Sequence, residues 1–305
     1  MNVRPAIRQK TLKGTVRCAG VGLHSGQMVT MTLHPAAVDT GITFRRTDAN
    51  VEIGATWRNL VPSCLCSTLA ADGVSVGTIE HLMAAFAGLE IDNALVAIDG
   101  AEVPAMDGSA APFVSLIERA GIAEQNAPRR AVEILKPIRV AGDGAEASLE
   151  PADGFSLSFV IDFASGMVGR QRIAVTPDPA SFKRGIARAR TFGFYDEVEQ
   201  MRSAGLALGG SLENAIVIGQ DGVMNKEGLR YRDEFVRHKV LDAMGDLYLA
   251  GGPIIGRFTG HRSGHALNRR LLQRLFADQT AWRFTTLAAK RPADAWDEAP
   301  HRATA

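Results

Sequence analysis

The chain has 305 residues, of which 46% are hydrophobic and 22% are charged, and its formal net charge at pH 7 is +1. This balance gives no electrostatic reason to expect nucleic-acid binding, and no stretch approaches the roughly 18 apolar residues of a membrane span. The three cysteines form no disulfide framework and the N-terminus lacks an apolar signal core, so we expect a cytoplasmic protein.

The first part of the chain has the pattern of several strands combined with two helices. Strands are expected at about 29–34, 41–45 and 93–98, helices at about 79–87 and 111–120, and a hairpin turn at 71–73. The polar segment 124–130 contains a proline and is interpreted as a linker. The first α+β domain would therefore cover residues 1–123.

The second part, residues 131–285, repeats this order of strands and helices and is interpreted as a second α+β domain. Strands are expected at about 131–175 and 254–258, and helices at about 181–190, 232–249 and 266–277, the first with Ser181 as its N-cap. The glycine-rich region between the first two of these helices is expected to hold an apolar insert at about 193–223. Residues 286–305, rich in alanine, proline and charge, are expected to form a flexible tail.

Two motifs far apart in the chain suggest a metal site. Glu80 and His81 open one expected helix, while His238 and Asp242 lie four residues apart on one face of another. Catalytic zinc ions are typically held by three such nitrogen or oxygen ligands, here two imidazoles and a carboxylate, and keep a fourth coordination position open for water. Glu80 would be the base that takes a proton from this water. The pattern alone is also compatible with an ordinary surface pair that binds no metal, because histidine and aspartate four residues apart commonly occur on exposed helix faces.

Two neighbouring features support the metal interpretation. Asp246 continues the stripe of His238 and Asp242 by four residues, and His265 lies at a glycine-rich turn before the last helix. Catalytic groups concentrate on such loops. The pair Cys64 and Cys66 has no second cysteine pair to complete a structural zinc site.

Several specific stretches occur in an order that resembles a known family. They are 22–26 (GLHSG), 78–85 (TIEHLMAA), 88–93 (GLEIDN), 102–109 (EVPAMDGS), 190–194 (RTFGF), 209–211 (GGS), 237–242 (RHKVLD) and 263–268 (SGHALN). Together they resemble the UDP-3-O-(3-hydroxyacyl)-N-acetylglucosamine deacetylase family, the zinc amidases of the first committed step of lipid A synthesis. The resemblance extends over nearly the whole chain to about Ala277.

The resemblance implies a fold and an activity. The fold would be two similar α+β domains, each a sheet layered on a helix pair, with the helices packed between the sheets and the active site at the domain interface. The activity would be zinc-dependent hydrolysis of the N-acetyl amide of UDP-3-O-(3-hydroxyacyl)-N-acetylglucosamine, which yields acetate and the free amine for lipopolysaccharide synthesis. The partner would be this acylated nucleotide sugar alone. We expect a monomer with no membrane span and at most transient proximity to the inner membrane.

The resemblance also implies a metal set and a base. The metal ligands would be His81, His238 and Asp242, and Glu80 would take a proton from water. The cofactor would be Zn²⁺, although Fe²⁺ suits the same nitrogen and oxygen ligands.

Further catalytic roles follow from the same resemblance. His265 would carry a positive charge that stabilises the oxyanion or protonates the leaving amine, and Asp246 would orient it. Thr191 would donate a hydrogen bond to the oxyanion. Lys239 would direct its charge toward the phosphate or the oxyanion of the substrate.

The implied substrate site has an apolar part and a nucleotide part. The acyl groove would be lined by Phe192, Val198, Ala207, Ser211, Ala215 and Val217, and the nucleotide end would lie near Asp162, Phe163 and Arg262. This chain departs from the family pattern where Ala164-Ser165 replaces a common His-Pro pair and where Arg262 replaces a frequent lysine. The nucleotide contacts are therefore left open.

Two other functions remain compatible with the sequence. A zinc amidase for another acylated amine would share the metal set but would not need the apolar insert. A non-catalytic protein that binds acylated nucleotide sugar would keep the fold and would be expected to lose Glu80 or a metal ligand, all of which are present.

Overall fold

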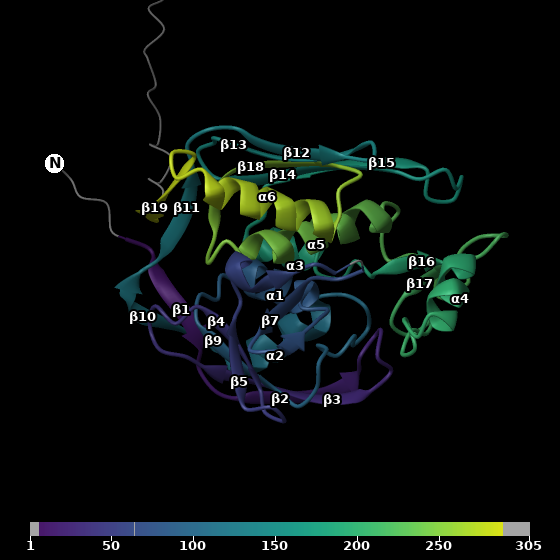
Figure 1. Cartoon of the computed structure of the whole chain (residues 1–305), viewed down its shortest axis with the longest axis horizontal. Coiled ribbons are helices and arrows are strands. Elements are labelled where there is room, and N and C mark those ends of the chain that lie inside the picture. Colours follow the sequence, from purple (N-terminus) through teal and green to yellow (C-terminus); the bar gives the residue numbers. More distant parts are fainter. Residues whose placement is uncertain (1–5, 64, 289–305) are drawn as a thin grey trace, which may run out of the picture.

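A computed structural model describes residues 6–63 and 65–288, which form a mixed α+β fold (Figure 1). Its helices are α1 (Glu80–Gly88), α2 (Ala111–Ala120), α3 (Pro179–Gly185), α4 (Tyr195–Ser203), α5 (Glu234–Tyr248) and α6 (His265–Ala277), with one 3₁₀ turn, η1 (Trp57–Asn59). None of the helices in these residues combines the length and the apolar character needed to cross a membrane.

The first half of the chain builds a five-stranded sheet in the order β2-β3-β9-β4-β5. Its strands are β2 (Val16–Val21), β3 (Met28–Pro35), β4 (Ile42–Arg46), β5 (Val51–Gly54) and β9 (Ala94–Ile98). Burial alternates along β3, whose Met31 and Leu33 side chains are fully buried, as the period of a strand with one covered face requires.

A smaller three-stranded sheet lies beside it and contains the expected hairpin. Its strands are β6 (Leu60–Val61), β7 (Thr68–Ala71) and β8 (Val74–Val76). The turn residues Asp72 and Gly73 have φ angles of 51° and 76°, the pair of positive values that a two-residue hairpin turn of type I′ requires. The sequence prediction of this hairpin is confirmed.

The second half of the chain builds a seven-stranded sheet around β18, which pairs with β11 and β14 in parallel and with β13 in antiparallel orientation. The strands are β11 (Arg130–Ile134), β12 (Ile138–Gly142), β13 (Ala145–Glu150), β14 (Phe155–Asp162), β15 (Arg170–Val175), β18 (Ile254–His261) and β19 (Trp282–Thr286). In Figure 1 the helices α1, α5 and α6 lie between this sheet and the five-stranded one.

The close contact between α1 and α5 sets the geometry of this helical layer. A Cβ atom added at Gly245, in the last turn of α5, would lie 2.0 Å from the backbone oxygen of Glu80, the first residue of α1. Only glycine permits this approach of two backbones. The contact places the beginning of α1 directly against the last turn of α5.

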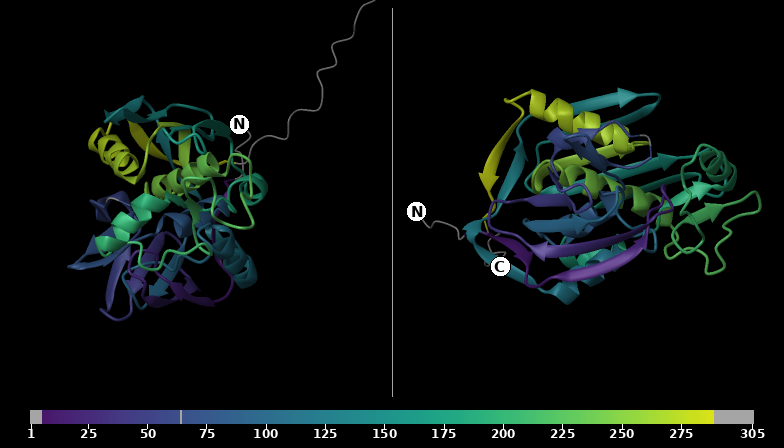
Figure 2. Two further views of the ribbon diagram at one scale, coloured as in Figure 1. Left: turned by 90° about the vertical axis from the view of Figure 1, so that its right-hand side faces the viewer. Right: turned by 60° about the horizontal axis from the view of Figure 1, so that its bottom comes forward.

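A small unit projects from one end of these layers, as the views in Figures 1 and 2 show. It consists of β16 (Phe192–Phe194), α4 and β17 (Ile216–Ile218), with β16 and β17 paired in parallel. The helix α4 was not expected within the apolar insert. It has no buried residue, so its sequence lacks the apolar periodicity by which a core helix is recognised.

Two segments have a local structure that the sequence did not predict. Residues 124–130, expected as a linker, are extended. Most of them belong to β10 (Ile122–Pro128), which pairs with β1 (Arg8–Leu12), and β11 starts at Arg130. The helix expected to begin with Ser181 as its N-cap is capped by Asp178 and ends at Gly185, because the Asp178 carboxylate accepts hydrogen bonds from the backbone of Ala180 and Ser181.

The expected tail at 286–305 falls mostly beyond the described residues. The structure places Thr286 at the end of β19, and 289–305 lie outside the part of the chain that it describes, as does Cys64.

We expect Gly245→Ala to destabilise the fold. Alanine in a helix is favoured over glycine by about 0.5–1 kcal/mol, but the clash with the Glu80 carbonyl should outweigh this and cost about 1–3 kcal/mol or more. The free energy of unfolding, measured in urea, tests the prediction. Gly154→Ala is the control, because a Cβ there meets no atom within 4 Å. Equal stability of the two variants would contradict the proposed tight contact.

Candidate active site

Three potential metal ligands converge where α1 meets α5. His81 comes from the first turn of α1, and His238 and Asp242 lie one turn apart on α5. All three are buried, and their candidate ligand atoms lie within 4.8 Å of one another. The Oδ1 atom of Asp242 is 3.2 Å from Nε2 of His238 and 3.5 Å from Nε2 of His81. The structure therefore brings together the three residues that the motifs suggested.

The protonation of His238 makes this cluster suited to a cation. Its Nδ1 atom lies 3.0 Å from the carbonyl oxygen of Ala189, which can only accept, so Nδ1 carries the proton. Burial lowers the pKa of His238 to about 3 despite the nearby Asp242 carboxylate, so the ring is neutral and Nε2 presents a lone pair. Asp242 Oδ1 is buried and has no hydrogen-bond partner. Two acceptors thus face each other with no proton between them, an arrangement that a bound cation would satisfy.

The second oxygen of Asp242 is held by Lys239. Its Nζ atom donates to Asp242 Oδ2 at 2.7 Å. Burial disfavours the Asp242 charge, but His238, Lys239 and other neighbours outweigh it and hold the pKa of this carboxyl well below its usual range. The resemblance implied that Lys239 points toward the substrate, whereas here its ammonium is engaged by the ligand carboxylate.

Glu80 lies beside this cluster as a candidate base. One carboxylate oxygen accepts a hydrogen bond from the backbone N–H of Ser67 at 3.0 Å, and the other is 3.9 Å from Nε2 of His265. Burial raises the pKa of Glu80, although His265 and His81 oppose the rise. A buried carboxyl with a raised pKa is matched to proton transfer near neutral pH.

His265, the first residue of α6, faces the three carboxylates of the site. Its Nδ1 atom is 2.9 Å from Asp246 Oδ2, and its Nε2 atom is 3.9 Å from Asp242 Oδ2. Burial opposes a charge on the ring, but the carboxylates of Asp246, Glu80 and Asp242 together raise the pKa of His265 to about 10. The imidazole is therefore a cation at neutral pH.

Two residues that hold this site were missed in the sequence. Ser67 donates its hydroxyl to Asp246 and its backbone N–H to Glu80, and Asn268 donates to Asp246 Oδ2 at 2.8 Å. Asn268 lies three residues after His265 on α6, so helical spacing could have indicated it. No local pattern distinguishes Ser67, whose contact with Asp246 joins segments 179 residues apart.

A strained residue just before α1 joins two other stretches of the chain to the site. Thr78 is buried and has a φ of 55°, which is unusual and costly for a β-branched residue. Its hydroxyl donates to Glu102 at 2.8 Å, and Glu102 also accepts from the backbone N–H groups of His24 and Ser25. This arrangement ties the 22–26 and 102–109 stretches to the start of α1.

A largely apolar cavity of about 260 Å³ leads from the candidate metal ligands into the projecting unit. The six expected acyl-groove residues all line it, namely Phe192, Val198, Ala207, Ser211, Ala215 and Val217. Thr191 lines it as well, as do His238 and His265. A chain of methylene groups would meet a matching surface here.

The expected nucleotide residues are more scattered. Phe163 lines a second cavity, together with Lys239, His265 and Arg270. Asp162 and Arg262 are exposed and line neither this cavity nor the apolar one. Arg262 has a φ of 52° and follows β18, whose end pairs with the end of β14.

Comparison with known proteins gives one consistent result. The family described as UDP-3-O-acyl N-acetylglycosamine deacetylase matches residues 9–277. The chain is 53% identical to the UDP-3-O-acyl-N-acetylglucosamine deacetylase of Nitrosococcus oceani over 92% of its length and 93% of that protein. It is 52% identical to the proteins of the same name from Chromohalobacter salexigens and Acidithiobacillus ferrooxidans, with similar coverage.

The charge on His265 leads to a testable prediction. In chelator-treated protein, the His265 imidazole should stay doubly protonated from pH 6 to about pH 9, because its pKa is raised to about 10. Asp246→Asn removes a carboxylate that favours the cation and should lower this pKa by about 1–3 pH units. ¹H–¹⁵N NMR of the imidazoles measures both values. A variant that titrates like the wild type would show that Asp246 does not hold the charge.

Proposed function

Because the chain belongs to the UDP-3-O-acyl N-acetylglycosamine deacetylase family, we propose that it hydrolyses the N-acetyl amide of UDP-3-O-(3-hydroxyacyl)-N-acetylglucosamine. The products are acetate and the free amine, and the reaction serves lipid A biosynthesis. The observation that carries this proposal at the site is the unpartnered Asp242 Oδ1 atom, which faces the lone pair of His238 within reach of His81.

We assign the metal to these three residues. Two imidazole nitrogens and one carboxylate oxygen are a donor set that zinc accepts with a position left open, and ferrous iron accepts it too. A zinc ion held there supplies a positive charge that acidifies water and polarises the amide carbonyl. His238 serves as ligand because its proton stays on Nδ1, and Asp242 serves because it is ionised.

Proton transfer is assigned to Glu80 and His265. Glu80 takes a proton from the attacking water while the water oxygen bonds to the acetyl carbon. His265, already protonated, neutralises charge on the carbonyl oxygen or gives its proton to the nitrogen as the C–N bond breaks. The Asp246 carboxylate accepts a hydrogen bond from Nδ1 of His265, which favours the charged imidazole and fixes the orientation of its ring. The Thr191 hydroxyl, at the wall of the same cavity, donates to the carbonyl oxygen.

The acyl chain is assigned to the apolar cavity. It starts at the candidate catalytic residues and continues between β16, α4 and β17, where it is lined by side chains such as Val198 and Val217. We place the nucleotide in the direction of the second cavity, which Phe163 and Arg270 line, with Asp162 and Arg262 farther out.

We further propose that residues 1–123 and 131–285 are two domains with the active site at their interface. Glu80 and His81 belong to the first, and His238, Asp242 and His265 to the second. Support comes from the two large sheets, one in each part of the chain, with α1 packed against α5 between them.

The reaction assignment predicts metal-dependent acetate release that requires Glu80. Treatment with a chelator should abolish turnover of UDP-3-O-(3-hydroxymyristoyl)-N-acetylglucosamine, and zinc or ferrous iron should restore it. Glu80→Ala should lower kcat by about 100-fold or more while the variant still binds metal, because the base and not a ligand is lost. Acetate release by chelator-treated protein, or near-normal turnover by the variant, would refute the assignment.

The assignment of the cavity predicts chain-length dependence. Ala215→Trp should fill the apolar cavity and raise KM for the hydroxymyristoyl substrate by about 10-fold or more. The KM for a substrate with a short acyl chain should rise much less. Gln200→Trp is the matched control, since Gln200 is exposed on α4 and does not line the cavity. The same KM change for both chain lengths would place the acyl group elsewhere.

A further inference from the structure

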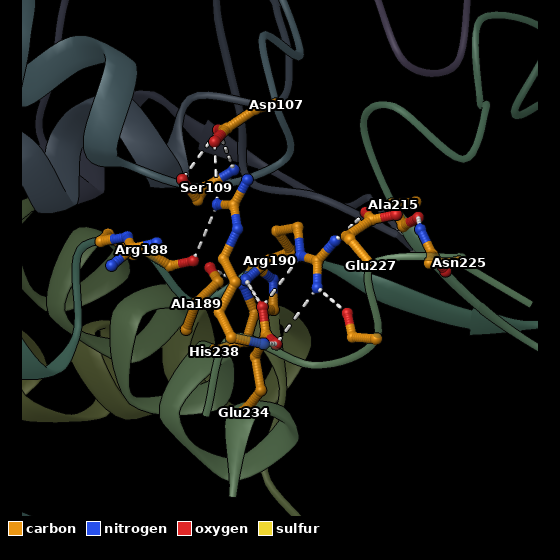
Figure 3. A network of polar contacts seen from close by, with 12 residues as sticks. Asp107, Ser109, Arg188, Ala189, Arg190, Ala215, Asn225, Glu227, Glu234 and His238 are labelled. Atoms are coloured by element: carbon orange, nitrogen blue, oxygen red, sulfur yellow. Dashed lines mark hydrogen bonds and ion pairs between the residues drawn. The ribbon is translucent and has the colours of Figure 1, made fainter. Parts of the chain in front are cut away.

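A buried ion pair lies next to the candidate metal ligands and takes no part in the proposed chemistry. The Arg190 and Glu234 side chains are 1% and 0% exposed, and Nε of Arg190 lies 3.0 Å from Glu234 Oε1 (Figure 3). Taking two charges out of water costs about as much as their attraction returns, so such pairs add little stability on balance. A contribution to stability therefore does not explain why this ion pair is buried here.

Two side chains of α5, Glu234 of the ion pair and His238, hold a single peptide group at its two ends. The backbone N–H of Arg190 donates to Glu234 Oε1 at 3.0 Å, while the carbonyl of Ala189 accepts from His238 Nδ1 at 3.0 Å. This N–H and this carbonyl belong to the same planar peptide unit. Glu234 and His238 lie one turn apart on α5, so one helix grips the Ala189–Arg190 peptide from both sides, as Figure 3 shows.

The guanidinium group anchors this peptide from a third direction. Arg190 donates through Nη1 to Glu227 at 2.6 Å and through Nη2 to the carbonyl of Gly228 at 2.7 Å. Glu234 also accepts from the backbone N–H of Arg230. Thr191, which follows Arg190 in the chain, lines the apolar cavity. Rotation of the clamped peptide would thus disturb both a metal ligand and the cavity wall.

We infer that Arg190 and Glu234 are positioning residues for the metal ligand His238. They fix the Ala189 carbonyl, which keeps the imidazole proton on Nδ1 and directs Nε2 toward Asp242 and His81. The inference deepens the proposed function and rests on the metal site assigned there. Groups that orient metal-binding histidines in this way affect metal affinity by about 10–100-fold in other proteins.

Two variants separate positioning from stability. The double variant Arg190→Met/Glu234→Met replaces both charges by apolar side chains of similar length, an exchange that often preserves stability. Glu234→Met alone removes both acceptor oxygens from the N–H groups of Arg190 and Arg230, while the guanidinium keeps its contacts with Glu227 and Gly228. Glu227→Gln is the matched control: it removes a carboxylate from the same guanidinium, but its side chain is 58% exposed and does not touch the clamped peptide.

The experiment has one measurement without metal and one with it. In chelator-treated protein with ¹⁵N-labelled histidine, NMR should show a slowly exchanging His238 Nδ1–H signal in the wild type and in Glu227→Gln. The signal should exchange rapidly in the double variant and in Glu234→Met. Zinc affinity, measured by competition with a chromophoric chelator, should fall by about 10–100-fold in these two variants and stay unchanged in the control.

The two measurements keep the two claims apart. A double variant that melts near the wild-type temperature and keeps both the Nδ1–H signal and the zinc affinity would overturn the inference. If the double variant does not fold, the same readouts in Glu234→Met decide the matter. A wild type that shows the signal but binds no zinc would refute the proposed function, while the signal in the variants still tests the clamp.

Discussion

The approach of α5 to α1 at Gly245 is the constraint from which the site follows. Because the two backbones touch there, Glu80 and His81 at the start of α1 face Asp242 and Asp246 in the last two turns of α5 without long side chains or loops to bridge a gap. The groups are thereby placed on rigid helices that are buried between two sheets, which suits a site that must hold its geometry during a reaction. Ser67 reinforces the same junction, since it contacts Glu80 from one side and Asp246 from the other.

The electrostatics of the site depend on this burial. Three carboxyl groups, those of Glu80, Asp242 and Asp246, lie close to two cationic groups, Lys239 and His265. Uncompensated charge is costly in such surroundings, so the raised pKa of Glu80 and the raised pKa of His265 are two responses to one environment. A divalent cation at Asp242 would compensate the remaining negative charge. The same burial therefore prepares a base, an acid and a metal position.

The sequence predicted the elements with strong local signals. Apolar periodicity and glycine stops located α1 and α2, and the Asp-Gly turn located the β7–β8 hairpin. Helical spacing placed His238, Asp242 and Asp246 on one face. What could not be predicted depends on contacts between distant segments. The helix α4 has no buried face, residues 124–128 form a strand by pairing with β1, and Ser67 acquires its contacts only when the chain has folded. The clamp on the Ala189–Arg190 peptide uses backbone atoms, which no side-chain pattern reports.

The most direct test of this account is the position of the metal. A crystal of zinc-loaded protein, measured on both sides of the zinc absorption edge, should give one strong anomalous peak bounded by Nε2 of His81, Nε2 of His238 and Oδ1 of Asp242. Glu80 should be close by but not coordinated. A peak at another site, such as the neighbourhood of Cys66 and His24, or no peak despite bound zinc in solution, would contradict the claim that the α1–α5 contact builds the catalytic metal centre.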